Sequence, residues 1–201
     1  MENNTQLKEM IRSMVIDVLQ GQKQETASSQ PIKQAPRGQV EPGVFDTVDE
    51  AIQAAKAAQA RFEDCTLATR EKVIADIRAA MRPRVQELAQ KTVDETGMGR
   101  VADKVLKLNL TLNKTPGVED LVTECETGDN GMTLYELSAY GVIGAITPST
   151  NPAETLICNS IGMLAAGNAI FFSVHPGAKN LSRELVSELN QVIAKSIGIE
   201  N

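Results

Sequence analysis

The chain has 201 residues and a formal net charge of −6, from 20 basic and 26 acidic side chains. This length suffices for one or two domains with a buried core. The Lys and Arg residues form no cluster, which argues against nucleic acid as a partner. Three scattered cysteines and a single histidine give no metal-ligand spacing. We therefore expect no metal site. We also expect the cysteines to be reduced thiols in a cytoplasmic protein.

Residues 5–19 (TQLKEMIRSMVIDVL) are expected to form a short amphipathic helix that begins at Thr5 and ends before Gly21. Its apolar stripe comprises Leu7, Met10, Ile11, Met14, Val15, Val18 and Leu19. Charged residues interrupt these apolar positions, so the segment does not resemble a signal peptide. No stretch of the chain approaches the ~18 apolar residues of a membrane span, and we expect no membrane partner.

Residues 20–43 are rich in Gln, Ser, Pro and Gly and are expected to form a flexible linker. The chain would then consist of a helix (1–19), a tether and a globular body at 44–201. Two interpretations of the helix remain open, because it can dock on a partner or pack on its own body. The length of the tether favours the partner.

The body is expected to open with a helix that is rich in alanine. Thr47-x-x-Glu50 forms a capping box, and the helix that it starts runs to about Phe62. Its buried side is expected to comprise Val48, Ile52, Ala55 and Phe62.

Two further helical regions are predicted at 66–95 and 100–113. Pro83 is expected to break or restart the first of them, because proline lacks the backbone N–H that the helix needs. Gly97 is expected to end it in the left-handed conformation. Glu95, just before that cap, is interpreted as a solvated or capping residue and not as an acid or base catalyst.

The spacing of the apolar residues then changes from the spacing typical of a helix to the spacing typical of a strand. Residues 127–137 carry an Asp-Asn-Gly turn and a hairpin signal. Buried apolar strands are expected at 141–146 and 169–174, each followed by a helix, at 152–166 and 178–196. This order predicts an α/β fold with parallel strands and covering helices. Two strands are too few for a complete doubly wound sheet, so we expect a partial Rossmann-type sheet.

Asn151 ends a polar loop that follows the first parallel strand, and ligands bind at such strand ends in open α/β sheets. Its side-chain amide can stabilise an oxyanion as a carbonyl is attacked. The alternative is that Asn151 only caps the next helix. Pro152 suits the first turn of that helix.

The second strand is followed by His175, Pro176 and Gly177. His175 can donate a hydrogen bond to a ribose or phosphate, or it can be a loop histidine without a role. The chain has no GxGxxG fingerprint. Cys158 lies on an apolar helix and is expected to pack in the core, because a reactive thiolate needs a polar, partly exposed setting.

Six blocks of sequence resemble the CoA-acylating aldehyde dehydrogenases of bacterial microcompartments, of the propionaldehyde and acetaldehyde dehydrogenase type. The blocks are R-x-x-x-I-x-x-I at 70–77, ETGMGR at 95–100, KTPGVE at 114–119, TGDNGMTL at 127–134, TPSTNPA at 147–153 and AAGNAIFFSVHP at 165–176. The resemblance runs from about residue 44 to the end. It implies an aldehyde-dehydrogenase-like fold of which this chain carries the N-terminal part of the cofactor-binding domain.

The resemblance also implies the chemistry. Family members oxidise a short-chain aldehyde with NAD⁺ through a cysteine thiohemiacetal and pass the acyl group to coenzyme A. Asn151 matches the oxyanion-stabilising asparagine of the family. Two of the family's cofactor-binding loops also have matching residues in this chain. The loop along the nicotinamide half is matched by Thr147, Pro148, Ser149 and Thr150, and the region around the adenosine ribose by His175, Pro176 and Gly177. NADP in place of NAD remains open.

Two partners are implied in the same way. The segment 5–19 resembles an encapsulation peptide that docks on a shell protein in the lumen of a microcompartment. The hairpin resembles the oligomerisation arm of the family, which implies a homo-oligomer.

None of Cys65, Cys125 and Cys158 matches the nucleophile, so the chain is expected to be inactive alone. It would be a fragment, a truncated product or one piece of a split enzyme. The alternative function is a non-catalytic paralogue that binds shell or full-length enzyme.

Overall fold

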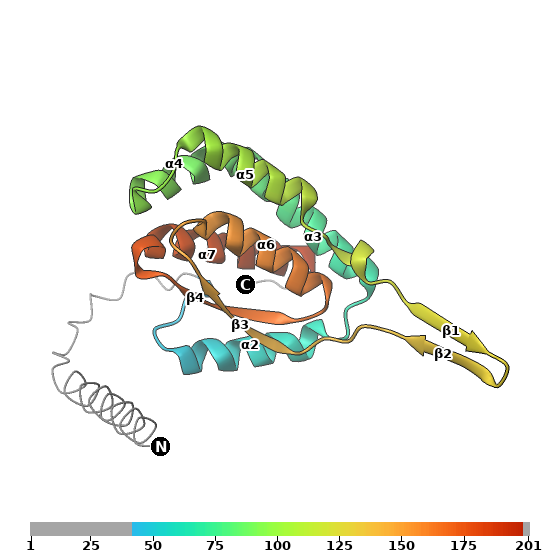
Figure 1. Cartoon of the computed structure of the whole chain (residues 1–201). Helices are drawn as coiled ribbons and strands as arrows, with labels where there is room; N and C mark the ends of the chain where they lie inside the picture. Colours follow the sequence, from blue (N-terminus) through green and yellow to red (C-terminus); the bar gives the residue numbers. More distant parts are fainter. Residues whose placement is uncertain (1–41, 199–201) are drawn as a thin grey trace, which may run out of the picture. The chain divides into compact units, whose positions relative to one another are not determined.

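The computed structural model describes residues 42–198 (Figure 1). The expected targeting helix at 1–19 and the linker as far as residue 41 lie outside the described residues. The described part begins just before α2, and its elements follow in the order predicted from the sequence. No described helix is long and apolar enough to cross a membrane.

The helical half comprises α2 (Val48–Phe62), α3 (Leu67–Met81), α4 (Val85–Thr96) and α5 (Val101–Lys114). Thr47 and Glu50 cap α2 reciprocally, as predicted, with both hydrogen bonds at 3.2 Å. Pro83 lies in the 3-10 turn Arg82–Arg84 that separates α3 from α4.

Gly97 ends α4 in the left-handed conformation, with φ at 67°. Only glycine adopts this conformation without steric cost, and the predicted cap is confirmed.

A hairpin follows, formed by β1 (Glu124–Gly128) and β2 (Gly131–Tyr135). The strands are antiparallel, and Gly128 faces Gly131 across the turn. All the residues of both strands are exposed, and Figure 1 shows the hairpin extending away from the helices. The predicted hairpin is confirmed, and it contributes nothing to the core.

The remaining elements form a β-α-β-α unit. They are β3 (Val142–Thr147), α6 (Pro152–Ala165), β4 (Ala169–Val174), the 3-10 turn η3 (Pro176–Ala178) and α7 (Lys179–Ser196). The two strands pair in parallel, from Val142 opposite Ala169 to Thr147 opposite Val174. Figure 1 shows α2 on one face of this sheet and α6 and α7 on the other. The predicted parallel arrangement is confirmed.

Asn168 sets the start of both strands. Its side chain is 2% exposed, and its Oδ1 accepts the backbone N–H groups of Tyr140 (2.7 Å) and Gly141 (3.0 Å). Its Nδ2 donates to the carbonyl of Met163 at the end of α6. One buried amide therefore ties the end of α6 to the segments that enter β3 and β4.

The core lies between the helices, on the side of the sheet that α6 and α7 cover. It joins α3, α4, α5, α6 and α7 through side chains that are almost wholly removed from water. The largest of these are Val73, Ile77, Met81, Leu88, Leu108, Leu112, Leu156, Ile157, Ile161, Leu181 and Leu185. Aliphatic residues supply nearly all of this apolar area, as the scarcity of aromatic residues requires.

Three expectations about burial are wrong. Val48 is 60% exposed in the first turn of α2. Ile146 is 86% exposed, because it points to the opposite face of β3 from the buried Ala145 and Thr147. Cys158 is exposed because it lies about 100° around α6 from the buried Ile157.

Candidate functional site

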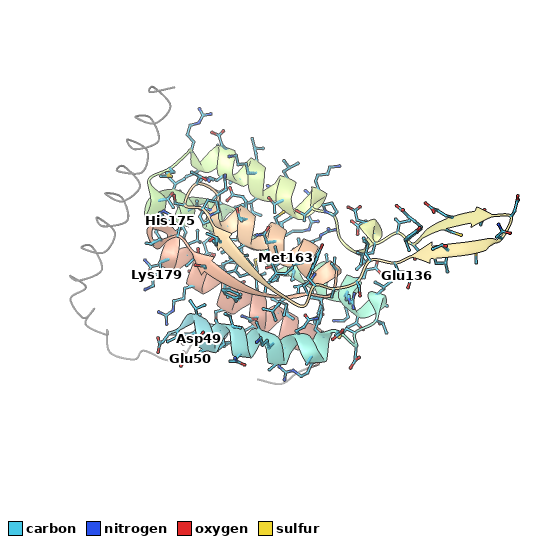
Figure 2. All side chains as sticks on the ribbon, turned by 60° about the horizontal axis from the view of Figure 1, so that its bottom comes forward. Asp49, Glu50, Glu136, Met163, His175 and Lys179 are labelled. Carbon is cyan, nitrogen blue, oxygen red and sulfur yellow. The ribbon has the colours of Figure 1, made fainter. Side chains whose placement is uncertain are left out.

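The loops that leave β3 and β4 lie at one edge of the sheet. Parallel pairing places Thr147 opposite Val174, where the two strands end. A Cβ built on Gly177 would lie 4.0 Å from the Cβ of Ser149, so the two loops approach van der Waals contact. The cofactor residues predicted on both loops are therefore brought together at this edge. Figure 2 shows His175 and Lys179 at this end of the sheet.

Asn151 stands at the N-cap position of α6, but its side chain makes no capping hydrogen bond. Its Oδ1 instead accepts from two ammonium groups of α5, Lys104 Nζ at 3.3 Å and Lys107 Nζ at 3.2 Å. The helix-cap alternative is thus wrong for the side chain. Within the described part of the chain, no hydrogen bond occupies Asn151 Nδ2, so its two N–H donors are open to a ligand.

Lys104 is buried, at 3% exposure, although it carries a charge. Its Nζ also donates to the backbone carbonyl of Thr150 and lies 3.5 Å from Glu154 Oε1. Glu154 is 7% exposed in the first turn of α6, where a carboxylate interacts favourably with the helix dipole.

Sequence reasoning assigned no role to Lys104, Lys107 or Glu154. A signal was present, since Lys104 interrupts the stripe of Val101, Val105, Leu108 and Leu112 that packs in or against the core. A lysine on the apolar face of a helix indicates a buried charge that needs a partner.

His175 is exposed and caps the turn η3. Its Nδ1 accepts the backbone N–H of Gly177 at 3.0 Å, so the proton of the neutral ring lies on Nε2. Nε2 of this exposed side chain is therefore a hydrogen-bond donor. The structure thus gives His175 a defined orientation and tautomer, in contrast to a loop histidine without a role.

The end of α4 completes the site. The carboxylate of Glu95 accepts the backbone N–H groups of Asn180 (2.8 Å) and Leu181 (2.7 Å) at the N-terminus of α7. Met98, in the following turn, accepts a hydrogen bond from Ser149 Oγ at 3.9 Å. The capping interpretation of Glu95 is confirmed, although the helix that it caps is α7 and not its own.

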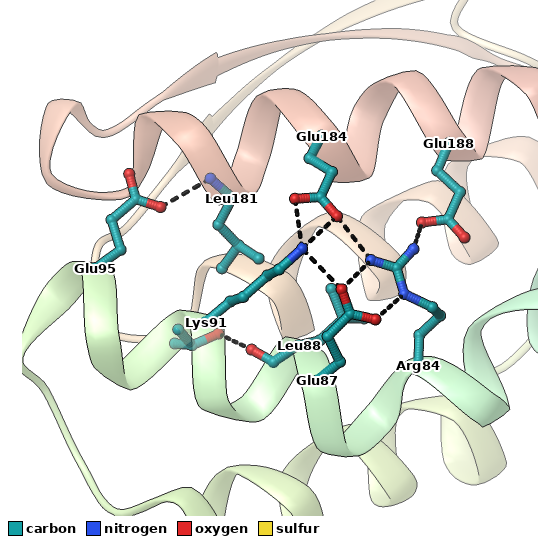
Figure 3. Close-up of polar contacts among 9 residues, drawn as sticks. Arg84, Glu87, Leu88, Lys91, Glu95, Leu181, Glu184 and Glu188 are labelled. Atoms are coloured by element: carbon teal, nitrogen blue, oxygen red, sulfur yellow. Dashed lines mark hydrogen bonds and ion pairs between the residues drawn. The ribbon is translucent and has the colours of Figure 1, made fainter.

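An ion-pair network fixes α4 to α7 behind the site (Figure 3). Arg84 binds Glu87, Glu184 and Glu188, and Lys91 binds Glu87 and Glu184. Arg84, and then Lys91, lower the pKa of Glu87 to about 2, and Lys91 and Arg84 also lower the pKa of Glu184. The neighbouring cations therefore stabilise the charged form of Glu87 and of Glu184.

A cavity of about 670 Å³ is lined by residues of α2, β4 and α7, together with Ser160 and Leu164 of α6. Its lining is largely apolar and includes Phe62 and Phe171, and it reaches the second loop at Val174 and Lys179. Asn151 does not line it. Among residues 42–198, no group of three or more His, Cys, Asp and Glu side chains is placed to hold a metal ion.

The sequence and the fold resemble known proteins. A family model described as the aldehyde dehydrogenase family matches residues 18–191. The propanal dehydrogenase (CoA-propanoylating) of Salmonella typhimurium is 45% identical over 99% of this chain and 41% of its own length. The chain thus spans about two fifths of that relative.

Two solved structures have a similar fold. An engineered glycolyl-CoA reductase with bound NADP⁺ is 47% identical, with a TM-score of 0.75 over 77% of this chain and 35% of that one. A propionaldehyde dehydrogenase from the fucose utilisation bacterial microcompartment of Clostridium phytofermentans is 46% identical, with a TM-score of 0.72 over 79% of this chain and 36% of that one. The resemblance noted in the six sequence blocks is confirmed, and the chain belongs to the aldehyde dehydrogenase family.

Proposed function

We propose that this chain carries the oxyanion donor and two cofactor-binding loops of an NAD-dependent, CoA-acylating aldehyde dehydrogenase. The reaction would convert a short-chain aldehyde and coenzyme A to an acyl-CoA. One observation carries the proposal. The amide of Asn151 stands at the carboxyl end of a parallel strand, and its donors are not used to cap α6. The Salmonella relative, a CoA-propanoylating enzyme, supports this reaction class.

The chemistry needs a donor at this point. When a thiolate attacks the aldehyde, negative charge develops on the carbonyl oxygen, and an N–H group aimed at it stabilises the transition state. Removing one such donor from an oxyanion hole typically lowers kcat by about 10²–10³-fold. We assign this role to Asn151.

The nucleophile is assigned to none of the cysteines in this chain. Cys125 lies on the exposed hairpin, and Cys65 follows α2. Cys158 is seven residues beyond Asn151 on α6, about 10 Å along the helix axis. We therefore propose that the chain alone does not form the acyl thioester.

A dinucleotide fits the residues of the two loops. The Nε2–H of the exposed His175 is a donor for a ribose hydroxyl or a phosphate, while Pro176 and Gly177 follow it in η3. Thr147 Oγ1 is buried and has no hydrogen-bond partner in the described part, and the loop continues through Pro148, Ser149 and Thr150. The bound dinucleotide would supply the acceptor for the hydride. The NADP⁺ in the engineered reductase supports a dinucleotide here and leaves NAD versus NADP open.

Partners are proposed from two segments. Residues 5–19 would bind a microcompartment shell protein, which would place the chain in the microcompartment lumen. The Clostridium relative is from a microcompartment, which supports this location. The exposed hairpin, with Met132 at 64% and Leu134 at 58% exposure, would join copies of the chain in a homo-oligomer. The same hairpin favours the alternative of a non-catalytic partner protein, since it can bind full-length enzyme without chemistry.

The test is a calorimetric titration of the full chain with NAD⁺ and with NADP⁺, together with an NADH assay that contains propionaldehyde and coenzyme A. We expect dinucleotide binding that weakens in His175→Ala, and no NADH above the blank. Lys56→Ala, an exposed change on α2, is the matched control. Absence of binding would refute the cofactor role, and CoA-dependent NADH formation would refute the assignment of the cysteines.

A further inference from the structure

The hydrogen bonds of Asn151 leave its amide only one orientation. Its Oδ1 lies 3.3 Å from Lys104 Nζ and 3.2 Å from Lys107 Nζ. An ammonium group donates and cannot accept, so an amide turned by 180° would place its NH₂ group against two cations. The oxygen must face α5, and the two N–H donors must face away from it.

We propose that Lys104 is a positioning residue that holds and polarises the Asn151 amide. The inference rests on the proposed role of Asn151 and names the groups that make its donors effective. A loop asparagine without such contacts rotates about its side-chain bonds, and each rotation moves the donors away from the ligand. Lys104 removes this freedom from within the fold.

Burial and two contacts fix Lys104 itself. Its side chain is 4% exposed, it donates to the carbonyl of Thr150, and Glu154 Oε1 lies 3.5 Å from its Nζ. Both carboxylate oxygens of Glu154 are buried and lack a hydrogen-bond partner in the described part, so this carboxylate serves as a counter-charge for the ammonium. A buried charge needs such a counter-charge, and Glu154 supplies it from the same helix that Asn151 begins.

Lys104 and Lys107 both donate to Asn151 Oδ1, but they differ in burial, and this difference decides which of them holds the amide more firmly. Lys107 is exposed, so water competes for its ammonium and its side chain retains rotamer freedom. Lys104 is buried, where its charge acts through a lower dielectric. Two cations on the oxygen also draw electron density from the nitrogen, which strengthens the N–H donors toward a developing oxyanion. Lys104 is therefore the stronger of the two positioning groups.

The test is nuclear magnetic resonance of the ¹⁵N-labelled full chain, with the side-chain amide signals of Asn151 identified by their loss in Asn151→Asp. We expect this pair of signals to be rigid, with a high heteronuclear NOE, and shifted downfield from those of exposed asparagines. In Lys104→Met, which keeps the apolar stem and removes the charge, the pair should become mobile and return to the ordinary position. Lys114→Met, at an exposed lysine of the same helix, is the matched control and should leave the signals unchanged.

Lys104→Met leaves Glu154 as an unpaired buried charge, so a second variant guards against unfolding. Lys104→Met/Glu154→Met removes both charges, and it should fold and show the same mobile amide. Rigid, downfield signals in either folded variant would overturn the proposal. Titration of the same samples with NAD⁺ tests the proposed function separately. If NAD⁺ did not bind, the proposed cofactor role would fail, while the mobility and shift of the Asn151 amide signals would still test the role of Lys104.

Discussion

Glu95 on α4 holds the first turn of α7, because one of its carboxylate oxygens accepts the backbone N–H of Leu181 at 2.7 Å (Figure 3). The other oxygen accepts the N–H of Asn180 at 2.8 Å. A helix N-terminus leaves its first N–H groups without partners, and a carboxylate satisfies them and interacts with the helix dipole. The contact spans 86 positions of the sequence and sets where α7 begins, directly after the loop of His175.

Replacing Glu95 by alanine should therefore lower the free energy of unfolding by about 1–2 kcal/mol, the usual cost of a lost helix cap. Urea denaturation followed by circular dichroism measures this change. Glu71→Ala, at an exposed glutamate of α3, should change stability by less than about 0.5 kcal/mol. Equal losses in the two variants would show that the Glu95 cap contributes nothing specific.

Local patterns predicted the elements well. The capping box at Thr47, the break at Pro83 and the cap at Gly97 are set by residues next to them in sequence, and each is confirmed. The β-α-β order also predicted the parallel pair and thereby placed Asn151 and His175 at one edge of the sheet.

The partners of the site residues could not be predicted, because they come from other elements. Lys104 reaches Asn151 across 47 positions, and no local pattern specifies that contact. Burial of single residues was also misjudged. Glu154 is the one charged residue of α6, so composition could not show that Cys158 faces away from the core.

The network around Arg84 predicts a loss of stability in acid. The pKa of Glu87 is about 2 in the folded chain against an ordinary 4.5, because Arg84 and then Lys91 donate to its carboxylate. A lowered pKa means that this contribution is fully present above about pH 4.5 and is lost as the pH falls toward 2. We expect Glu87→Gln to lower the urea midpoint near pH 6 and to have a smaller effect near pH 3. A difference between variant and native chain that stays constant across this range would contradict the assignment.

Shortening a buried side chain should lower the free energy of unfolding far more than shortening an exposed one. Leu156 on α6 is fully buried, and Leu156→Ala should lower the free energy of unfolding by about 2–5 kcal/mol through lost burial and the cavity that remains. Leu106 on α5 is 69% exposed, and Leu106→Ala should change stability by less than about 0.5 kcal/mol. Chemical denaturation of both variants tests the location of the core, and a large loss in Leu106→Ala would indicate that α5 is covered in solution.

Two glycines near the end of α6 should respond to alanine with opposite signs. Gly167 has φ at 80°, and a Cβ there would lie 2.7 Å from the guanidinium carbon of Arg70. Gly167→Ala should therefore destabilise the chain by more than about 1 kcal/mol, since an L-residue is strained at this φ and Arg70 must move. It would also disturb the Gly167 carbonyl, which accepts a hydrogen bond from Gln59 Nε2 at 3.0 Å.

Gly162 lies within α6, and a Cβ there would meet no atom within 4 Å. Gly162→Ala should stabilise the chain by about 0.5–1 kcal/mol, because alanine loses less backbone entropy than glycine in a helix. Thermal unfolding of the two variants under one set of conditions gives the signs directly. A stabilising Gly167→Ala would mean that the turn between α6 and β4 differs in solution, and the placement of Asn168 at the start of both strands would then need revision.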